Sequence, residues 1–269
     1  MELRDADLAV RTRGLTKSFR KRTVVDGLDL AIPRGSVYGF LGPNGSGKST
    51  TMKMLLGLLH PSAGQVFLLG EDPWGEARAR LMPRIGSMIE HPPGYGHLTG
   101  AENMRLLARL LNLETTRIDR ALELVRLTDH RDRLQRTYSL GMKQRLGIAM
   151  ALAREPELLI LDEPTNGLDP AGIEEIRELM IHLASGGVTV MISSHLLDEI
   201  DRMADILGVL SQGRLVFQGS RKELFERSIP DLLVVTPQAN AAANLVRGCR
   251  LERNGIRVQG CGQEDAARL

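Results

Sequence analysis

The chain has 269 residues, of which 42% are hydrophobic and 25% are charged, and its formal net charge is +2. These values are ordinary for a globular protein with one large α/β domain and a small appendage, and the near-neutral charge gives no electrostatic case for a nucleic-acid partner. No apolar run approaches the ~18 residues that span a bilayer, and the first residues lack the apolar core of a signal peptide. We therefore expect a cytosolic chain whose membrane role comes from a partner.

The N-terminal part holds short apolar segments separated by turn signals. Residues 8–41 follow this pattern, which predicts a small β-rich layer. Phe19 lies at a turn between polar residues within it. An aromatic side chain there either stacks on the flat face of a purine or packs in the core, and the pattern alone leaves both possibilities open.

A glycine-rich stretch between a predicted strand, residues 37–41, and a predicted helix, residues 51–56, is the strongest signal. This is the context that a G-x-x-x-x-G-K-[ST] motif requires. Backbone N–H groups at a helix N-terminus bind anions, and glycines allow torsions and close approach that a Cβ would block. A lysine in this motif reaches the β- and γ-phosphates of a nucleoside triphosphate, and the following hydroxyl holds Mg²⁺. The predicted nucleotide-binding residues are Gly42, Pro43, Asn44, Gly45, Ser46, Gly47, Lys48, Ser49 and Thr50, with Ser49 also a metal ligand.

A helical region follows. Residues 85–97 predict a strand that ends in a loop, and Thr99 opens a capping-box sequence before a periodic apolar run. Residues from about 99 to 153 therefore predict an inserted, mostly helical subdomain. Within it, the Ser139 hydroxyl and the Gly141 backbone N–H form a candidate anion site at a helix start, and an ordinary capped helix is the alternative.

Two buried strands are predicted to end in polar side chains. The apolar run 158–161 is followed by Asp162 and Glu163, at the strand end where ligands bind in open α/β sheets. We expect Asp162 to help hold Mg²⁺ and Glu163 to polarise the attacking water as general base, the alternative being two exposed acids. His195 follows the strand 188–194 at the same level, which favours contact with the γ-phosphate over a satisfied polar residue without a role.

The remainder completes the predicted fold. Asp169 is a natural N-cap with Pro170 in the first helical position. Residues 206–217 give a hairpin signal, and residues 226–269 predict a small β/α appendage without a catalytic pattern.

Taken in order, these elements resemble the ATP-binding cassette (ABC) family, over roughly residues 8–225. The resemblance implies an α/β fold: a P-loop NTPase core with a parallel sheet, an N-terminal β-rich layer, an inserted helical subdomain and a small C-terminal β/α appendage. It implies a cassette over residues 1–225 and an accessory region over residues 226–269. The matching elements are the Walker A loop at 42–50, the signature sequence at 139–144, the Walker B strand at 158–163, the D-loop at 166–169, the switch histidine His195 and the adenine-stacking aromatic Phe19.

Two differences from the usual ABC motifs indicate a particular branch of the family. The signature contains Ser-Leu-Gly-Met-Lys-Gln rather than Ser-Gly-Gly-Gln, and Glu90 stands where the family usually has glutamine. Both features are similar to exporters of the bacitracin- and lantibiotic-resistance type. The resemblance makes Glu90 a candidate nucleotide contact and metal ligand, alongside Ser49 and Asp162.

By this resemblance the working unit is a head-to-tail dimer of cassettes, homodimeric or heterodimeric, around two Mg-ATP. Ser139 and Gly141 of one subunit would face the γ-phosphate bound by Lys48 of the other, with Asp169 among the nucleotide contacts. A separate transmembrane permease would dock near Glu90, placing the chain at the cytoplasmic face of the membrane. The implied activity is ATP hydrolysis that drives export of drugs, antibiotic peptides or lipid-like molecules.

Two other functions are alternatives to an exporter ATPase. A soluble ABC-type ATPase acting on ribosomes or DNA is disfavoured because the chain holds one cassette, no coiled-coil arm and almost no net charge. A cassette that binds ATP without turnover is disfavoured by intact Lys48, Asp162, Glu163 and His195, although Glu90 leaves room for it.

Overall fold

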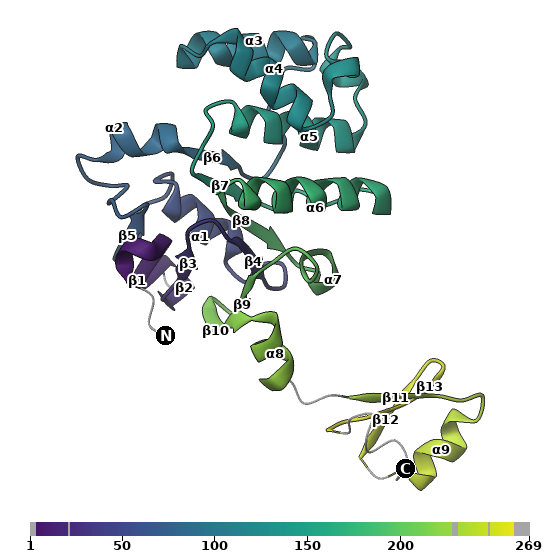
Figure 1. Ribbon diagram of the computed structural model, residues 1–269. Coiled ribbons are helices and arrows are strands. Elements are labelled where there is room, and N and C mark those ends of the chain that lie inside the picture. The colour runs from purple at the N-terminus through teal and green to yellow at the C-terminus, as the bar shows by residue number, and fades with distance from the viewer. Residues whose placement is uncertain (1–3, 21, 228–230, 247, 261–269) are drawn as a thin grey trace. The chain divides into compact units, whose positions relative to one another are not determined.

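A computed structural model describes residues 4–20, 22–227, 231–246 and 248–260. The chain forms two compact units, Met1–Arg221 and Lys222–Leu269, and each is considered by itself (Figure 1). Among the described residues no helix combines the length and apolarity needed to cross a membrane.

An antiparallel sheet near the N-terminus forms the predicted β-rich layer. Its central strand, residues 8–19, pairs with each of the three other strands, which are residues 22–28, 31–33 and 63–68. Leu8, Ala9 and Val10 at the start of β1 are all buried, whereas Arg13 and Gly14 further along it are exposed. Its strands are β1 (Leu8–Phe19), β2 (Arg22–Leu28), β3 (Ala31–Pro33) and β5 (Ala63–Leu68).

A second sheet forms the core of the larger unit. Its strand order is β10-β9-β4-β8-β7-β6, parallel throughout except for the antiparallel hairpin strand β10. Every residue of β4, β7 and β8 is buried, as expected for parallel strands covered on both faces. The strands are β4 (Val37–Leu41), β6 (Ile85–Met88), β7 (Leu158–Leu161), β8 (Thr189–Ser194), β9 (Ile206–Ser211) and β10 (Arg214–Ser220).

This topology brings four loops together. Leu41 pairs with Ser194, and Leu161 pairs with both Met88 and Ile192, so β4, β6, β7 and β8 end side by side. The segments that follow these ends carry the glycine-rich loop, Glu90, Asp162 and His195. Parallel pairing therefore collects residues from four distant parts of the sequence at one edge of the sheet.

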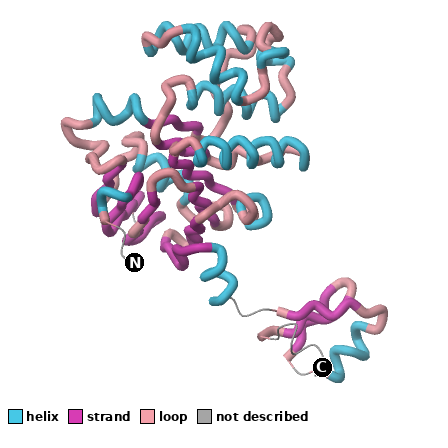
Figure 2. The backbone as a smooth tube through the Cα atoms, in the orientation of Figure 1, coloured by secondary structure: helices cyan, strands magenta, loops and turns pink. Residues whose placement is uncertain are grey.

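Helices cover the sheet and form the inserted subdomain. Helix α1 begins at Lys48, three residues before the predicted start, because the glycine-rich loop feeds directly into its first turn. Helices α3, α4 and α5 pack on one another at one end of the larger unit, and α5 also packs on β6 and β7 (Figure 2). The α-helices of this unit are α1 (Lys48–Leu55), α2 (Arg78–Leu81), α3 (Gly100–Leu111), α4 (Thr115–Leu124), α5 (Leu140–Leu152), α6 (Pro170–Ser185) and α7 (Leu197–Ile200), with short 3₁₀ turns at Asp5–Asp7, Met82–Arg84, Thr128–His130 and Gln135–Thr137.

The predicted capping box begins α3. The Thr99 hydroxyl accepts the Glu102 N–H at 3.1 Å, and the Glu102 carboxylate accepts the Thr99 N–H at 2.7 Å. Two N–H groups that would otherwise lack an intrahelical partner are thus satisfied.

Replacing Thr99 by alanine is expected to lower the free energy of unfolding by about 1 kcal/mol, the usual value of an N-cap hydrogen bond. Urea denaturation followed by circular dichroism measures this loss. Thr115→Ala, at the start of α4 where no side chain caps the helix, is the matched control. Equal stability of the two variants would contradict a stabilising role for the Thr99 cap.

The smaller unit is a β/α arrangement. Strands β11 (Leu232–Val235), β12 (Cys249–Glu252) and β13 (Gly255–Val258) form an antiparallel sheet in the order β11-β13-β12. Helix α9 (Ala239–Leu245) packs on β12 and β13, where Ile256 and Val258 are buried. Helix α8 (Arg221–Arg227) begins at the last residue of the larger unit.

Candidate functional site

The glycine-rich loop needs each of its glycines for a different reason. A Cβ on Gly42 would lie 2.4 Å from the Leu210 carbonyl oxygen, so close approach excludes a side chain there. Gly45 has open space but a φ of 79°, and Gly47 combines a φ of 109° with a Val24 carbonyl oxygen 2.9 Å from its Cβ position. No side chain caps α1, so its first backbone N–H groups face the loop and are available to an anion.

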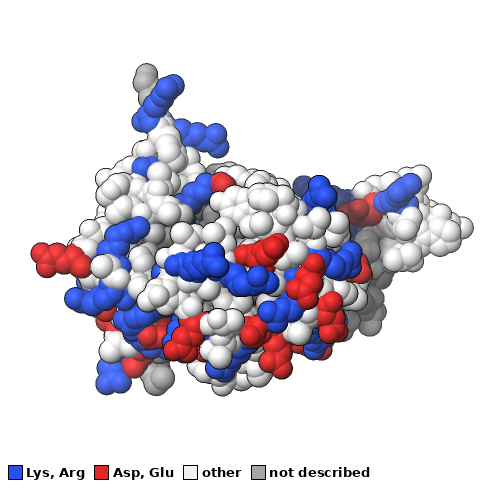
Figure 3. Space-filling view, turned by 90° about the horizontal axis from the view of Figure 1, so that it is seen from above, with Lys and Arg blue, Asp and Glu red and all other residues white. Residues whose placement is uncertain are grey.

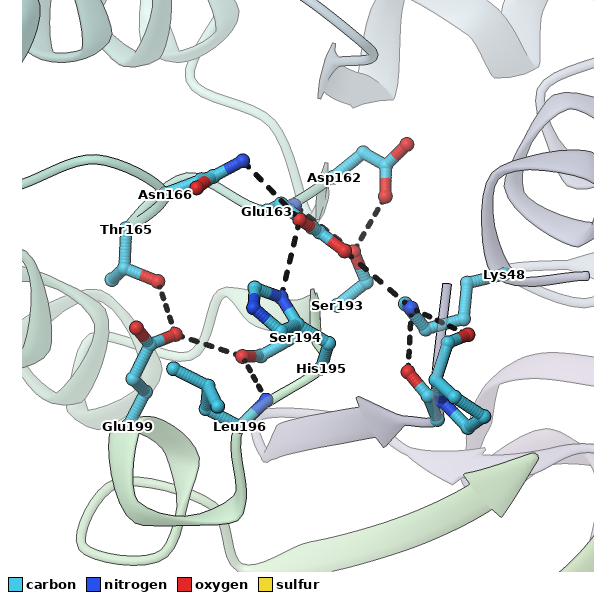
Figure 4. Close-up of polar contacts among 12 residues, drawn as sticks. Lys48, Asp162, Glu163, Thr165, Asn166, Ser193, Ser194, His195, Leu196 and Glu199 are labelled. Atoms are coloured by element: carbon cyan, nitrogen blue, oxygen red, sulfur yellow. Dashed lines mark hydrogen bonds and ion pairs between the residues drawn. The ribbon is translucent and has the colours of Figure 1, made fainter. Parts of the chain in front are cut away.

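Lys48 is buried at the start of α1, with 5% of its side chain exposed. Its Nζ donates to the Gly42 carbonyl at 2.7 Å and to the Pro43 carbonyl at 3.4 Å. The same Nζ lies 3.4 Å from Glu163 Oε1 (Figure 4). The ammonium group therefore contacts two carbonyls and one carboxylate within the site. To bind a phosphate, it would have to lose some of these contacts.

Glu163 lies between three of the converging loops (Figure 4). Besides the contact with Lys48, its Oε2 lies 3.4 Å from His195 Nδ1 and accepts from Asn166 Nδ2 at 3.5 Å. The backbone of Glu163 has a φ of 47°, a conformation that non-glycine residues adopt at a cost and that occurs at functional sites. This carboxylate thus connects the loop lysine to His195.

Asp162 is buried and is held by a residue that the sequence analysis did not single out. Ser193 Oγ donates to Asp162 Oδ1 at 2.5 Å and accepts the Glu163 N–H at 2.9 Å. The alternative of two exposed acids is therefore wrong for Asp162, which is 7% exposed. Consecutive serines at the end of the buried strand β8 are the sequence signal for this contact.

Glu199 is a second residue that sequence reasoning missed. Its Oε2 accepts the hydroxyls of Thr165 and Ser194, each at 2.8 Å (Figure 4). Thr165 follows the acidic pair, and Ser194 precedes His195. Glu199 therefore holds two of the loops together, and an acid within a short helix gives no sequence pattern that predicts this.

A cavity of about 640 Å³ opens between the sheet edge and α5. Another, of about 340 Å³, lies on the other side of the glycine-rich loop and includes Arg22 and Asn44. Among the described residues, Gln144 Oε1 in the first cavity and Ser46 Oγ in the second are buried polar atoms without a hydrogen-bond partner. The Ser46 hydroxyl can donate to a phosphate oxygen, whereas the Gln144 amide oxygen can accept only and suits a cation or a water. The first cavity is lined by Ser49, Glu90, His91, Pro92, Leu140, Gln144, Asp162, Glu163, Asn166 and Gly167.

Glu90 lines this cavity, but its carboxylate is engaged elsewhere. It forms an ion pair with Lys53 of α1, whose hydrogen bond holds the pKa of Glu90 below its usual value. Glu90, predicted as a metal ligand, therefore lines the same cavity as Ser49 and Asp162, but its carboxylate is paired with a lysine.

Ser139, Gly141 and Asp169 do not line that cavity. Ser139 Oγ accepts the Met142 N–H at 3.2 Å, and Asp169 Oδ1 accepts the Gly172 N–H at 3.0 Å, so both act as helix N-caps. A Cβ on Gly141 would lie 3.4 Å from the Leu168 side chain, which places the signature against the D-loop.

Phe19 is 47% exposed, with Lys17 Nζ 5.1 Å from the centre of its ring. The alternative of a core side chain is therefore wrong, and the stacking role remains a prediction.

A buried lysine directly after a glycine-rich loop, paired with the second of two acids at a parallel strand end, defines a P-loop nucleoside-triphosphatase. Residues 25–166 match the family described as ABC transporter. The chain belongs to the ABC transporter family, and it is an ATPase. The predictions of family, fold class and ATPase activity are confirmed.

Curated relatives support the same assignment. The bacitracin transport ATP-binding protein BcrA of Enterococcus faecalis is 46% identical, over 82% of this chain and 72% of the relative. The lantibiotic transport ATP-binding protein SrtF of Streptococcus pyogenes is 42% identical, over 82% of this chain and 97% of the relative. The structure of cbiO1 from Clostridium perfringens, part of the ABC transporter complex cbiONQ, has a TM-score of 0.75 and 30% identity, covering 82% of this chain and 92% of that chain.

Proposed function

We propose that this chain hydrolyses Mg-ATP between two cassettes and thereby drives a separate membrane subunit that exports a drug, an antibiotic peptide or a lipid-like molecule. The observation that carries the catalytic part is the position of Glu163, 3.4 Å from both Lys48 and His195. The names of the relatives, which are transport ATP-binding proteins for bacitracin and a lantibiotic, support the transport part.

In this proposal the glycine-rich loop and Lys48 bind the phosphates, and Ser49 with Asp162 holds Mg²⁺. One hydroxyl and one carboxylate suit this ion, which takes its remaining ligands from phosphates and water. When bound, Mg²⁺ neutralises charge on the transferred phosphoryl group. Glu163 orients the attacking water and accepts its proton, while His195 holds the Glu163 carboxylate and faces the γ-phosphate. Ser193 keeps the Asp162 carboxylate directed into the site.

The proposed dimer rests on two residues that each chain's own cavity does not include. Ser139 and Gly141 begin α5 but do not line the cavity that contains Ser49 and Asp162. We propose that they complete the nucleotide site of a second cassette, with Asp169 and Phe19 as further nucleotide contacts. ATP then joins the two cassettes, and hydrolysis releases them, which gives the two states that a transport cycle needs.

We also propose that two parts of the chain have different roles. Residues 1–225 form the cassette, with the helical subdomain at about 99–153 receiving the membrane subunit near Glu90. Residues 226–269 form an accessory region. Through the membrane subunit the chain is placed at the cytoplasmic face of the membrane.

The surface supports a protein partner rather than a nucleic acid. In the view of Figure 3, basic and acidic side chains are interspersed over the visible face. Two arginines of the helical subdomain are paired with carboxylates, Arg120 with Glu155 at 3.1 Å and Arg131 with Asp119 at 2.8 Å. Paired charges of this kind do not offer the basic surface that binds phosphate backbones.

Purification of the tagged chain from gently solubilised membranes tests the proposal. We expect a multi-span membrane protein to co-purify and to stimulate ATP hydrolysis when both are reconstituted. Recovery of ribosomes or DNA instead would replace the transport proposal by a soluble ATPase, with the nucleotide site unchanged.

Replacing Glu90 by glutamine is expected to alter coupling to the membrane subunit more than ATP affinity. The Lys53 ion pair already offsets the Glu90 charge, so we expect the affinity for ATP to change by less than about threefold, the range of a surface ion pair. Nucleotide titration of the isolated chain and ATP hydrolysis with the reconstituted partner measure the two effects. A loss of nucleotide binding as large as the loss of coupling would contradict this prediction.

A further inference from the structure

Lys53 lies on the same face of α1 as Ser49. The two residues are four positions apart, which places their side chains one helical turn apart on one face. Ser49 lines the 640 Å³ cavity, and Lys53, which does not line it, forms an ion pair with Glu90, which does. No phosphate-loop pattern includes Lys53.

Three carboxylates line that cavity, those of Glu90, Asp162 and Glu163. A triphosphate is itself negatively charged, so carboxylates that line its cavity repel it unless they are paired. Glu163 is offset by Lys48 at 3.4 Å, and Asp162 accepts the Ser193 hydroxyl at 2.5 Å.

Glu90 is offset by Lys53, whose Nζ donates to Glu90 Oε1. The two glutamates of the cavity thus each receive a lysine from α1, one from its first residue and one from its second turn. The pair is partly open to solvent, with 34% of the Lys53 side chain and 58% of the Glu90 side chain exposed.

We infer that Lys53 is a positioning residue for the nucleotide site, which holds the Glu90 carboxylate away from the metal position and offsets its charge. Without Lys53 the carboxylate is free to face the nucleotide. It then repels metal-free ATP and attracts Mg²⁺, so the dependence of ATP binding on Mg²⁺ increases. This inference rests on the proposed Mg-ATP site and adds a residue to it.

A double-mutant cycle of Lys53→Met and Glu90→Gln tests the inference. The dissociation constant of a fluorescent ATP analogue is measured by equilibrium titration with excess Mg²⁺ and with EDTA. The ratio of the EDTA value to the Mg²⁺ value is expected to rise about threefold to fivefold in Lys53→Met, the range of a partly exposed ion pair. The ratio is expected to be unchanged by Lys53→Met when Glu90→Gln is already present.

Two further variants make the result interpretable. Lys53→Arg keeps the ion pair and is expected to restore the wild-type ratio. Arg80→Met removes a comparable exposed ion pair, to Glu71 at 2.7 Å, from residues outside the cavity, and is expected to leave the ratio unchanged.

A rise of the same size with and without the Glu90→Gln substitution would overturn the inference, because Lys53 would then act on the phosphates directly. An unchanged ratio in Lys53→Met would overturn it as well. Failure of the proposed function has a different signature: the wild-type chain itself would bind the analogue without any effect of Mg²⁺, or not at all.

Discussion

Replacing Glu163 by glutamine is expected to slow ATP hydrolysis by about 10²–10⁴-fold, the usual contribution of a positioned general base. Glutamine keeps the size of the side chain and its reach toward Lys48 and His195, but it cannot accept the proton of the attacking water. It also removes a negative charge from the position that faces the γ-phosphate. We therefore expect ATP to remain bound and the dimer of cassettes to persist.

Steady-state phosphate release and size-exclusion chromatography in the presence of ATP measure these two effects. Glu157→Gln is a matched control, because Glu157 precedes β7 while Glu163 follows it, and its carboxylate pairs with Arg84 rather than with the site. Turnover that is unchanged in Glu163→Gln would remove this residue as the base. Slow turnover without an ATP-dependent dimer would separate the catalytic role from the proposed assembly.

Replacing Lys48 by methionine is expected to have the other large effect, a loss of ATP turnover of about 10²–10³-fold, the usual cost of removing one preorganised donor. Methionine fills a similar volume in this buried position but cannot donate to a phosphate. It also leaves the Gly42 carbonyl and the Glu163 carboxylate without their present partner, so the empty site is altered as well.

Titration with a fluorescent ATP analogue measures binding, and circular dichroism checks that the variant is folded. The double variant Lys48→Met with Glu163→Gln separates the two causes, since it has no carboxylate at this position. We expect ATP binding in the double variant to stay weak. Recovery of wild-type binding there would mean that the Glu163 charge without its lysine, and not the missing lysine itself, prevents ATP from binding.

Much of the fold could be predicted because its signals are local. The strand before the glycine-rich loop, the apolar run of β7 and the Thr99 capping box are each contained within a few residues, and each appears where the pattern indicates. The pattern places the start of α1 too late because glycine and serine favour loops, whereas here the loop ends at Gly47 and Lys48 is already helical.

The missing parts of the site depend on contacts between distant segments. Ser193 reaches Asp162 only because β7 and β8 are neighbours, and Lys53 reaches Glu90 across 37 positions of sequence. Glu199 joins two loops that follow different strands. The local sequence pattern determines neither the order of the strands in the sheet nor the direction of each side chain. These contacts therefore could not be predicted from the sequence. The pattern leaves Phe19 ambiguous for the same reason, and its exposure excludes the core.

The way in which the helical subdomain is attached has a mechanical consequence. The chain enters the subdomain after the carboxyl end of β6, past Glu90. It returns to the amino end of the neighbouring strand β7, so entry and return lie at opposite ends of these two strands. The return is clamped, since Arg84 before β6 makes two hydrogen bonds to Glu157 before β7, at 2.6 and 2.9 Å. At the departure, the Met88 carbonyl accepts the Asp162 N–H at 2.9 Å, and Glu90 beyond it forms a partly exposed ion pair with Lys53. We therefore expect a force on the helical subdomain to displace the Glu90 segment more readily than the segment held by Arg84 and Glu157.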